Sequence, residues 1–223
     1  IDTASVIVSL REAGMSLAEI KEYLSKKSPE NLITTLEKQE ELLRQQVSKL
    51  HQIQEMIQAR LQQTHKGLAN KKTSITIDYQ EQENIFLGPP LPADYDLTDG
   101  WTHLPEFYAK CREQNIQLGY TVGTLVAKEN LLERRWDKPS YYYYSLSDEI
   151  YPQFHVKPAG EYIVGTIHAD YGDTEQLYQK ILSFIEQKDL KIIGNAYEEY
   201  LIDEIAEKNS EDYLLQIAIQ VAA

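Results

Sequence analysis

Hydrophobic residues recur at heptad spacing along the first third of the chain. Ser28-Pro29 is typical of a helix start, with serine as the cap and proline at the first helical position, and no further proline or glycine occurs before Gly67. Glu40 and Gln54 interrupt the a positions, where isolated polar residues set register and orientation. The apolar a and d positions are Ile33, Leu36, Leu43, Val47, Leu50, Ile57 and Leu61. This stripe predicts a coiled-coil seam.

A helix over residues 29–70 would extend on the order of 55 Å at 1.5 Å per residue. Such a helix with a one-sided apolar stripe is unstable alone in water. We therefore expect a homodimer that pairs through this helix. The alternative is that the helix lies across the C-terminal domain of its own chain.

Two shorter helices are predicted before the long one. Gly14 suits the left-handed position that follows a helix, and Ser16 with Glu19 three residues later forms a capping box for the next helix. Any helical hairpin can use glycine, serine and glutamate in this way. The residues between Leu10 and Leu24 therefore predict two helices joined at Gly14, and by themselves no function.

After residue 73 the pattern changes to short strands and amphipathic helices, in two similar halves. The first half predicts a strand over 74–87, a helix over 98–115 and strands over 119–128 and 140–146. The second half predicts a strand over 161–168, a helix over 174–187 and strands over 196–202 and 213–221. We expect an α+β fold with two strand-helix-strand-strand units. A groove between such units is a usual place for a small ligand.

Composition limits the classes of protein that remain. The chain has 223 residues, of which 42% are hydrophobic, and no apolar run approaches the length of a membrane span, so we expect no membrane partner. No signal sequence is recognisable, and one cysteine, Cys111, cannot form an internal disulfide, so we expect a cytoplasmic protein. Cys111 lies in a predicted helix, where we interpret it as a packing residue.

The net charge of −13 is unevenly distributed along the chain. Up to Lys72 there are eleven Lys and Arg against nine Asp and Glu, whereas from Thr73 onward there are eleven against twenty-six. The acidic region repels phosphate and favours cations, so we do not expect it to contact nucleic acid. Solubility alone is the competing explanation of this acidity.

The two regions resemble parts of known families. The run from Leu10 to Leu24, read as L-R-x-x-G-x-S-L-x-E-I-K, resembles the second half of the DNA-binding domain of MerR-family transcription regulators, which precedes a long dimerisation helix. Pro158-Ala159-Gly160-Glu161-Tyr162, then His168 and Tyr171, then 197–203 (YEEYLID) resemble GyrI-like effector domains. In one departure, the glycine expected soon after His168 is delayed to Gly172.

The resemblance implies three regions: C-terminal helices of a MerR-type DNA-binding domain over 1–28, a coiled-coil dimerisation helix over 29–70, and a GyrI-like effector-binding domain over 73–223. The chain begins at Ile1 without methionine, and we expect it to be a piece of a longer protein whose preceding helices and wing read DNA. Promoter DNA and RNA polymerase are therefore expected partners of the full-length protein only.

The implied function is a ligand-responsive bacterial transcription regulator, not an enzyme, that binds a small lipophilic and cationic effector. Two alternatives stay open. Some free-standing GyrI-like proteins hydrolyse small electrophiles with a groove glutamate, and a groove filled by its own side chains would favour a protein-binding module.

By resemblance, Glu198 lies at the floor of the ligand groove among aromatic residues. Sixteen tyrosines, including 141–144 in one strand, suit a partly wet cavity that attracts cations. Strand alternation puts Tyr141 and Tyr143 on one face and Tyr142 and Tyr144 on the other, and the sequence does not say which pair lines the groove. Glu199 is expected to face solvent. The candidate ligand-binding residues are Glu198, Tyr200, Tyr141, Tyr143, Tyr162, Tyr120, Trp101 and Tyr213. No histidine or cysteine spacing indicates a metal site, and no cofactor motif is present.

Overall fold

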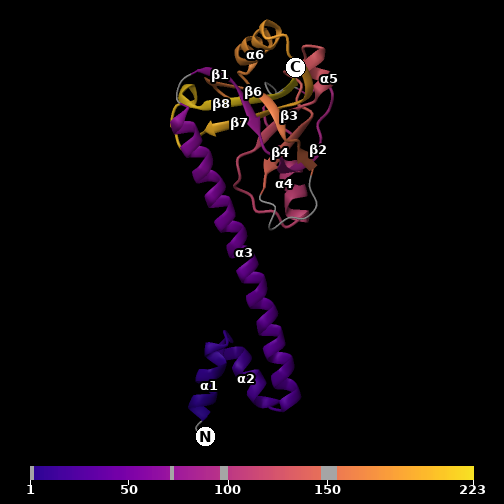
Figure 1. The fold of residues 1–223 in the computed structure, drawn as a ribbon. Coiled ribbons are helices and arrows are strands. Elements are labelled where there is room, and N and C mark those ends of the chain that lie inside the picture. Colours follow the sequence, from indigo (N-terminus) through magenta and orange to yellow (C-terminus); the bar gives the residue numbers. More distant parts are fainter. Residues whose placement is uncertain (1–2, 71–72, 96–99, 147–154) are drawn as a thin grey trace. The chain divides into compact units, whose positions relative to one another are not determined.

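The computed structural model of the chain describes residues 3–70, 73–95, 100–146 and 155–223. The described residues form two compact units that divide between Gln54 and Glu55, within the long helix (Figure 1). Each unit has its own core and is described by itself.

The first unit is helical. It contains α1 (Thr3–Glu12), α2 (Leu17–Ser25) and the first part of α3 (Pro29–Ala69). The expected capping box is present, because the Ser16 hydroxyl accepts the Glu19 amide at 3.3 Å and the Glu19 carboxylate accepts the Ser16 amide at 2.8 Å. Gly14 has φ +86°, the left-handed conformation expected after α1. The buried core of this unit consists of Leu10, Met15, Ile20 and Tyr23.

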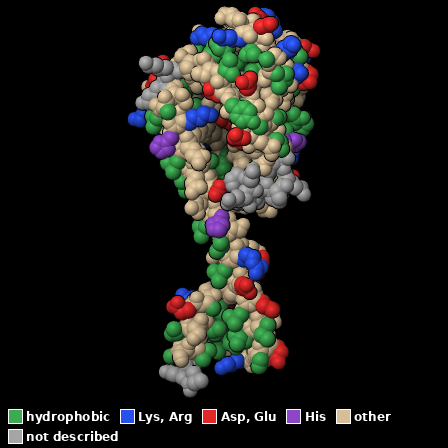
Figure 2. Space-filling view, viewed as in Figure 1, with side chains coloured by type: hydrophobic (Ala, Val, Ile, Leu, Met, Phe, Trp, Pro, Cys, Tyr) green, Lys and Arg blue, Asp and Glu red, His purple; other side chains and the backbone are tan. Residues whose placement is uncertain are grey.

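The long helix is confirmed as one continuous element of 41 residues. It passes through Gly67 and ends at Ala69. All seven apolar heptad residues are exposed in the single chain, from 39% at Leu36 to 63% at Leu50. Figure 2 shows apolar side chains along the free stretch of this helix. A stripe of this kind loses its contact with water only if something packs on it.

The second unit is built on an antiparallel sheet of eight strands in the order β1-β6-β8-β7-β3-β4-β2-β5. The strands are β1 (Ser74–Gln80), β2 (Glu83–Pro90), β3 (Gly123–Val126), β4 (Tyr141–Ser145), β5 (His155–Lys157), β6 (Gly160–His168), β7 (Lys191–Ile202) and β8 (Leu214–Ala222). The helices are α4 (Leu104–Glu113), α5 (Lys128–Leu132) and α6 (Glu175–Gln187), with a short 3-10 turn at Ser210–Asp212.

The expected duplication is present in the topology. One half is β2-α4-β3-β4 and the other is β6-α6-β7-β8, and β3 and β7 pair at the centre of the sheet. Helix α4 packs on β2 and β4, and α6 packs on β6, β7 and β8. The α+β class and the strand-helix-strand-strand repeat are therefore confirmed. The centre of the sheet, between the two helices, is the junction of the repeats.

Several predicted boundaries were wrong. The strand expected over 74–87 is two strands, because the chain leaves its pairing with β6 at Gln80 and pairs with β4 and β5 from Glu83 onward. The strand expected over 119–128 is only Gly123–Val126, and α5 follows it. Strand β5 was not predicted, and the second hairpin begins at Lys191. The helix expected over 98–115 is α4, which begins at Leu104 and ends at Glu113; residues 98 and 99 of the expected range lie outside the described residues.

Cys111 of α4 is fully buried in the core that this helix forms with β2 and β4. Burial raises the pKa of its thiol to about 12. A thiol with this pKa stays protonated at neutral pH, which agrees with the packing role expected for it. Within the described part of the chain, no helix combines the length and apolar character needed to cross a membrane.

Candidate functional site

Glu198 lies in β7 at the junction of the two repeats. Its side chain is 4% exposed and points to the sheet face that α4 and α6 cover. The carboxylate accepts hydrogen bonds from the Tyr178 hydroxyl of α6, at 2.6 Å, and from the Thr124 hydroxyl of β3. It has no ion pair with any described residue. Burial raises the pKa of Glu198 to about 7, and the two hydroxyl donors only partly oppose this effect.

Aromatic rings separate Glu198 from solvent. Tyr171 lies against Tyr200, with 4.5 Å between ring centroids, and against Trp101 at 5.2 Å. Trp101 in turn stacks on Tyr142 at 5.5 Å. The Tyr200 hydroxyl donates to the Asp170 carbonyl at 2.7 Å, which fixes its ring in place. The carboxylate is therefore held behind a wall of ring faces.

Two adjoining cavities are lined by these aromatic rings. The inner one, beside Glu198 and Thr124, holds only about 10 Å³. The outer one holds about 250 Å³ and contains Tyr120 and Tyr108. Trp101, Val122, Tyr171 and Tyr200 line both cavities. Glu198 lines the inner cavity, and the shared residues lie between it and the outer one.

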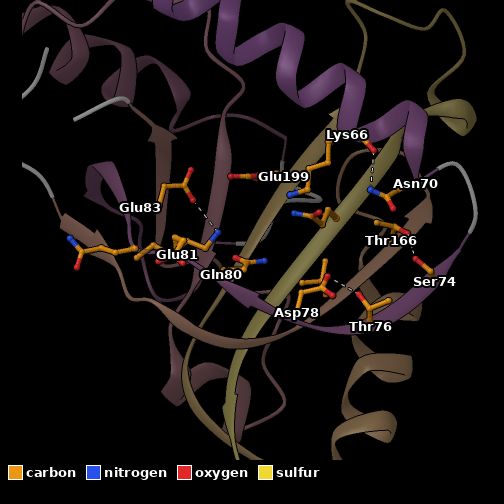
Figure 3. Close-up of a pocket in the computed structure, with 14 residues that line it drawn as sticks. Lys66, Asn70, Ser74, Thr76, Asp78, Gln80, Glu81, Glu83, Thr166 and Glu199 are labelled. Atoms are coloured by element: carbon orange, nitrogen blue, oxygen red, sulfur yellow. Dashed lines mark hydrogen bonds and ion pairs between the residues drawn. The ribbon is translucent and has the colours of Figure 1, made fainter. Parts of the chain in front are cut away.

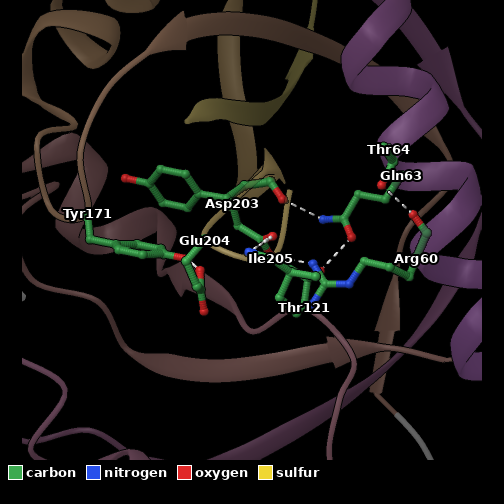
Figure 4. A network of polar contacts seen from close by, with 9 residues as sticks. Arg60, Gln63, Thr64, Thr121, Tyr171, Asp203, Glu204 and Ile205 are labelled. Atoms are coloured by element: carbon green, nitrogen blue, oxygen red, sulfur yellow. Dashed lines mark hydrogen bonds and ion pairs between the residues drawn. The ribbon is translucent and has the colours of Figure 1, made fainter. Parts of the chain in front are cut away.

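The last part of α3 closes the outer cavity. Arg60 of α3 lines it and forms an ion pair with Asp203, whose side chain is 5% exposed (Figure 4). Gln63 donates to the Tyr200 carbonyl at 2.7 Å and accepts the Thr121 hydroxyl. One turn later, a Cβ at Gly67 would lie 2.8 Å from Ile202, so only glycine permits this approach of helix to strand. The long helix thus contacts the same strand that carries Glu198.

The structure brings five of the eight expected ligand-binding residues to this region. Glu198 and Tyr200 line the inner cavity, Trp101 lines both cavities, and Tyr120 lines the outer one. Tyr213 lies behind them, with its ring 5.4 Å from that of Tyr171.

The other three lie on the opposite face of the sheet from Glu198, apart from the two cavities. Tyr141, Tyr143 and Tyr162 belong to a separate cluster with Tyr197. Strand alternation is the reason. Thr124 pairs with Tyr142 on one side and with Glu198 on the other, so these three residues share one face, and Tyr143 points to the other. The pair on the Glu198 side is therefore Tyr142 and Tyr144.

The solvent position expected for Glu199 is met in part. Glu199 does point away from Glu198, but its side chain is half-buried and accepts a hydrogen bond from the Tyr143 hydroxyl at 2.7 Å.

Sequence reasoning missed several residues of the site. Tyr171 was recognised only as part of a motif, and Tyr178, Thr124 and Arg60 were not singled out. Tyr178 lies three residues before Ile181 on the inward face of α6, so helical spacing could have found it. Thr124 and Arg60 reach the site through pairing and docking that no local pattern records. Among the described residues, no group of three or more possible ligands could hold a metal ion.

No family model matches the chain. The chain is 29% identical over 224 residues to the multidrug-efflux transporter 2 regulator of Bacillus subtilis strain 168, which covers 99% of this chain and 80% of that protein.

In structure, the chain is similar to EcmrR in its complex with DNA, with a TM-score of 0.52 and 15% identity, over 97% of this chain and 81% of that one. It is also similar to the separate EcmrR C-terminal domain, with a TM-score of 0.52 and 13% identity, over 67% of this chain and 98% of that one. The sequence likeness confirms the resemblance to a regulator, and the structural likeness confirms the fold.

Proposed function

We infer that this chain is a ligand-responsive transcription regulator of the MerR type with a GyrI-like effector-binding domain, and that its effector is a small lipophilic cation. The observation that carries the effector class is the buried Glu198 carboxylate, which two neutral hydroxyls hold behind aromatic rings. The likeness to a multidrug-efflux regulator over nearly the whole chain supports the regulatory role.

The chemistry of this site favours a cation. A carboxylate removed from water interacts strongly with an opposite charge, because little solvent screens the pair. Ring faces of tyrosine and tryptophan also attract cations, by about 0.5 to 2 kcal/mol each. A neutral or anionic ligand of the same shape would gain neither effect. Selectivity should therefore follow charge first and shape second.

The contacts of α3 offer a route from effector to helix. A ligand that moves Tyr200 or Tyr171 changes the wall next to Arg60 and Gln63, which hold the helix through Asp203 and the Tyr200 carbonyl. Coupling requires that the ligand bind two arrangements of these contacts with different affinity. We propose that the helix end is the element whose position the effector biases.

The exposed heptad residues support the proposal that α3 pairs with α3 of a second copy. Each is at least 39% exposed in the single chain, and together they form the seam that a coiled coil buries. In the full-length protein, we propose that this homodimer acts on promoter DNA together with RNA polymerase.

The effector proposal is tested by two ligands of equal shape and opposite charge. Calorimetric titration of the chain with tetraphenylphosphonium should show saturable binding, whereas tetraphenylborate should not bind in the same range. Mass spectrometry of the recovered cation should show it intact. Equal affinity for the two ions would overturn the charge argument, and turnover of a hydrolysable cationic ester that depends on Glu198 would favour the hydrolase alternative.

A further inference from the structure

A further cavity, of about 690 Å³, lies on the sheet face opposite Glu198 (Figure 3). Its floor is a row of polar side chains on four adjacent strands, because Ser74 pairs with Thr166, Thr166 with Gln216, and Gln216 with Glu199. Cross-strand partners share one face of a sheet, so the four side chains point into the same space. Lys66 and Asn70 at the end of α3 form its rim.

Gln216 is the unusual member of this row. Its side chain is 3% exposed and lines the cavity, yet it makes no hydrogen bond with any residue in the part of the chain that the structure describes. The small exposed part of this side chain faces the cavity, where its amide group meets solvent. The carboxamide offers two donors and an acceptor to whatever enters the cavity. Thr166, also 3% exposed, lies beside it with its hydroxyl 3.1 Å from that of Ser74.

The charge of the lining selects a cation. Four carboxylates line the cavity, from Asp78, Glu81, Glu83 and Glu199, against the ammonium groups of Lys66 and Lys157. Lys157 already pairs with Glu83 at 3.2 Å and lies over the Tyr197 ring. Among the residues that the structure describes, Glu199 accepts a hydrogen bond only from the neutral Tyr143 hydroxyl. Its carboxylate is therefore available to an ammonium group next to Gln216.

We propose that this cavity is a second ligand site, for a hydrophilic molecule that carries both hydroxyl and protonated amino groups, as amino sugars do. Gln216 and Thr166 bind the hydroxyls, and Glu199 binds an ammonium group. The cavity differs from the Glu198 site in having no wall of stacked rings. The two sites lie on opposite faces of the sheet, so this proposal does not rest on the effector proposed for Glu198.

Kanamycin is a suitable probe, titrated into the whole chain by calorimetry at physiological salt. We expect saturable binding that weakens about tenfold in Gln216→Met, which removes polar atoms but no charge. Glu199→Gln should weaken binding by a similar factor. Gln220→Met is the matched control, since Gln220 lies in the same strand and on the same face but donates to the Ala159 carbonyl outside this cavity, at 3.4 Å. It should leave the affinity within about twofold of the unmodified chain.

Two further ligands separate the contributions. Spermidine has amines without hydroxyls, and sucrose has hydroxyls without amines, so both should bind more weakly than kanamycin. Spermidine binding as tight as kanamycin, or equal kanamycin affinity in the unmodified chain and Gln216→Met, would show only attraction to an acidic protein and would overturn the proposal. Absence of saturable kanamycin binding below about 1 mM would overturn it as well.

Discussion

Replacement of Glu198 by glutamine separates the function of this residue from its effect on stability. The folded protein raises the pKa of Glu198 from an ordinary 4.5 to about 7, chiefly through burial. The folded state therefore binds this proton more tightly than the unfolded state. The resulting stability is fully present below pH 4.5, falls as the pH rises, and is lost above pH 7. At 1.36 kcal/mol per pH unit, the loss amounts to about 3 kcal/mol.

Glu198→Gln keeps the shape but cannot ionise: its amide oxygen accepts one of the Tyr178 and Thr124 hydroxyls, and its amide nitrogen donates to the oxygen of the other. We expect its free energy of unfolding to match that of the unmodified chain at pH 4.5 and to exceed it by about 3 kcal/mol at pH 8. For a unit of this size, the difference corresponds to a rise in melting temperature of roughly 6 to 12 °C. Thermal denaturation at the two pH values measures it.

The same change should weaken cation binding. Loss of a charge-assisted contact costs about 1.5 to 3 kcal/mol, which is roughly tenfold to a hundredfold in affinity for tetraphenylphosphonium. In the unmodified chain, binding below pH 7 must displace the Glu198 proton, so calorimetry in buffers of different ionisation enthalpy should detect proton release. Glu198→Gln should release none.

Glu199→Gln is the control for the Glu198 site, because Glu199 lies on the opposite face of the sheet and its replacement should leave the affinity of that site for tetraphenylphosphonium unchanged. The reasoning is refuted if Glu198→Gln lowers stability equally at both pH values, or if it binds the cation as tightly as the unmodified chain.

Two further predictions concern the long helix. Leu43→Asp with Leu50→Asp places charges in the heptad stripe, so sedimentation velocity at micromolar concentration should show a monomer where the unmodified chain is a dimer. Ser48→Asp changes an exposed polar residue and is the control. An unchanged dimer in the double variant would contradict the proposed seam. Arg60→Met leaves Asp203 buried without its ion-pair partner and should lower the free energy of unfolding by about 1 to 3 kcal/mol. The change in hydrogen exchange over residues 55–69 that we expect when tetraphenylphosphonium binds should be lost in this variant. Persistence of that change would exclude this ion pair from the coupling.

The sequence by itself determined the elements whose signals are local. The cap at Ser16, the left-handed Gly14 and the uninterrupted heptads predict the helices, since capping and side-chain periodicity depend on neighbours within a few residues. The two halves of the sheet domain follow from the repeated order of strand and helix. Glu198 was identified through a motif, and Trp101, Tyr120 and Tyr200 were expected beside it.

Only the tertiary structure decided which side chains share a face and what lies against them. Tyr143 and Tyr162 lie on the face of the sheet opposite Tyr142 because of the register of their strands. A shift of one residue in that register would exchange the two faces. The partners of Glu198, Tyr178 and Thr124, are 20 and 74 residues away along the chain. Such contacts depend on strand pairing and helix docking, which no short stretch of sequence specifies. The proton affinity of Glu198 follows from them, because burial of a carboxyl group is a property of the packed fold.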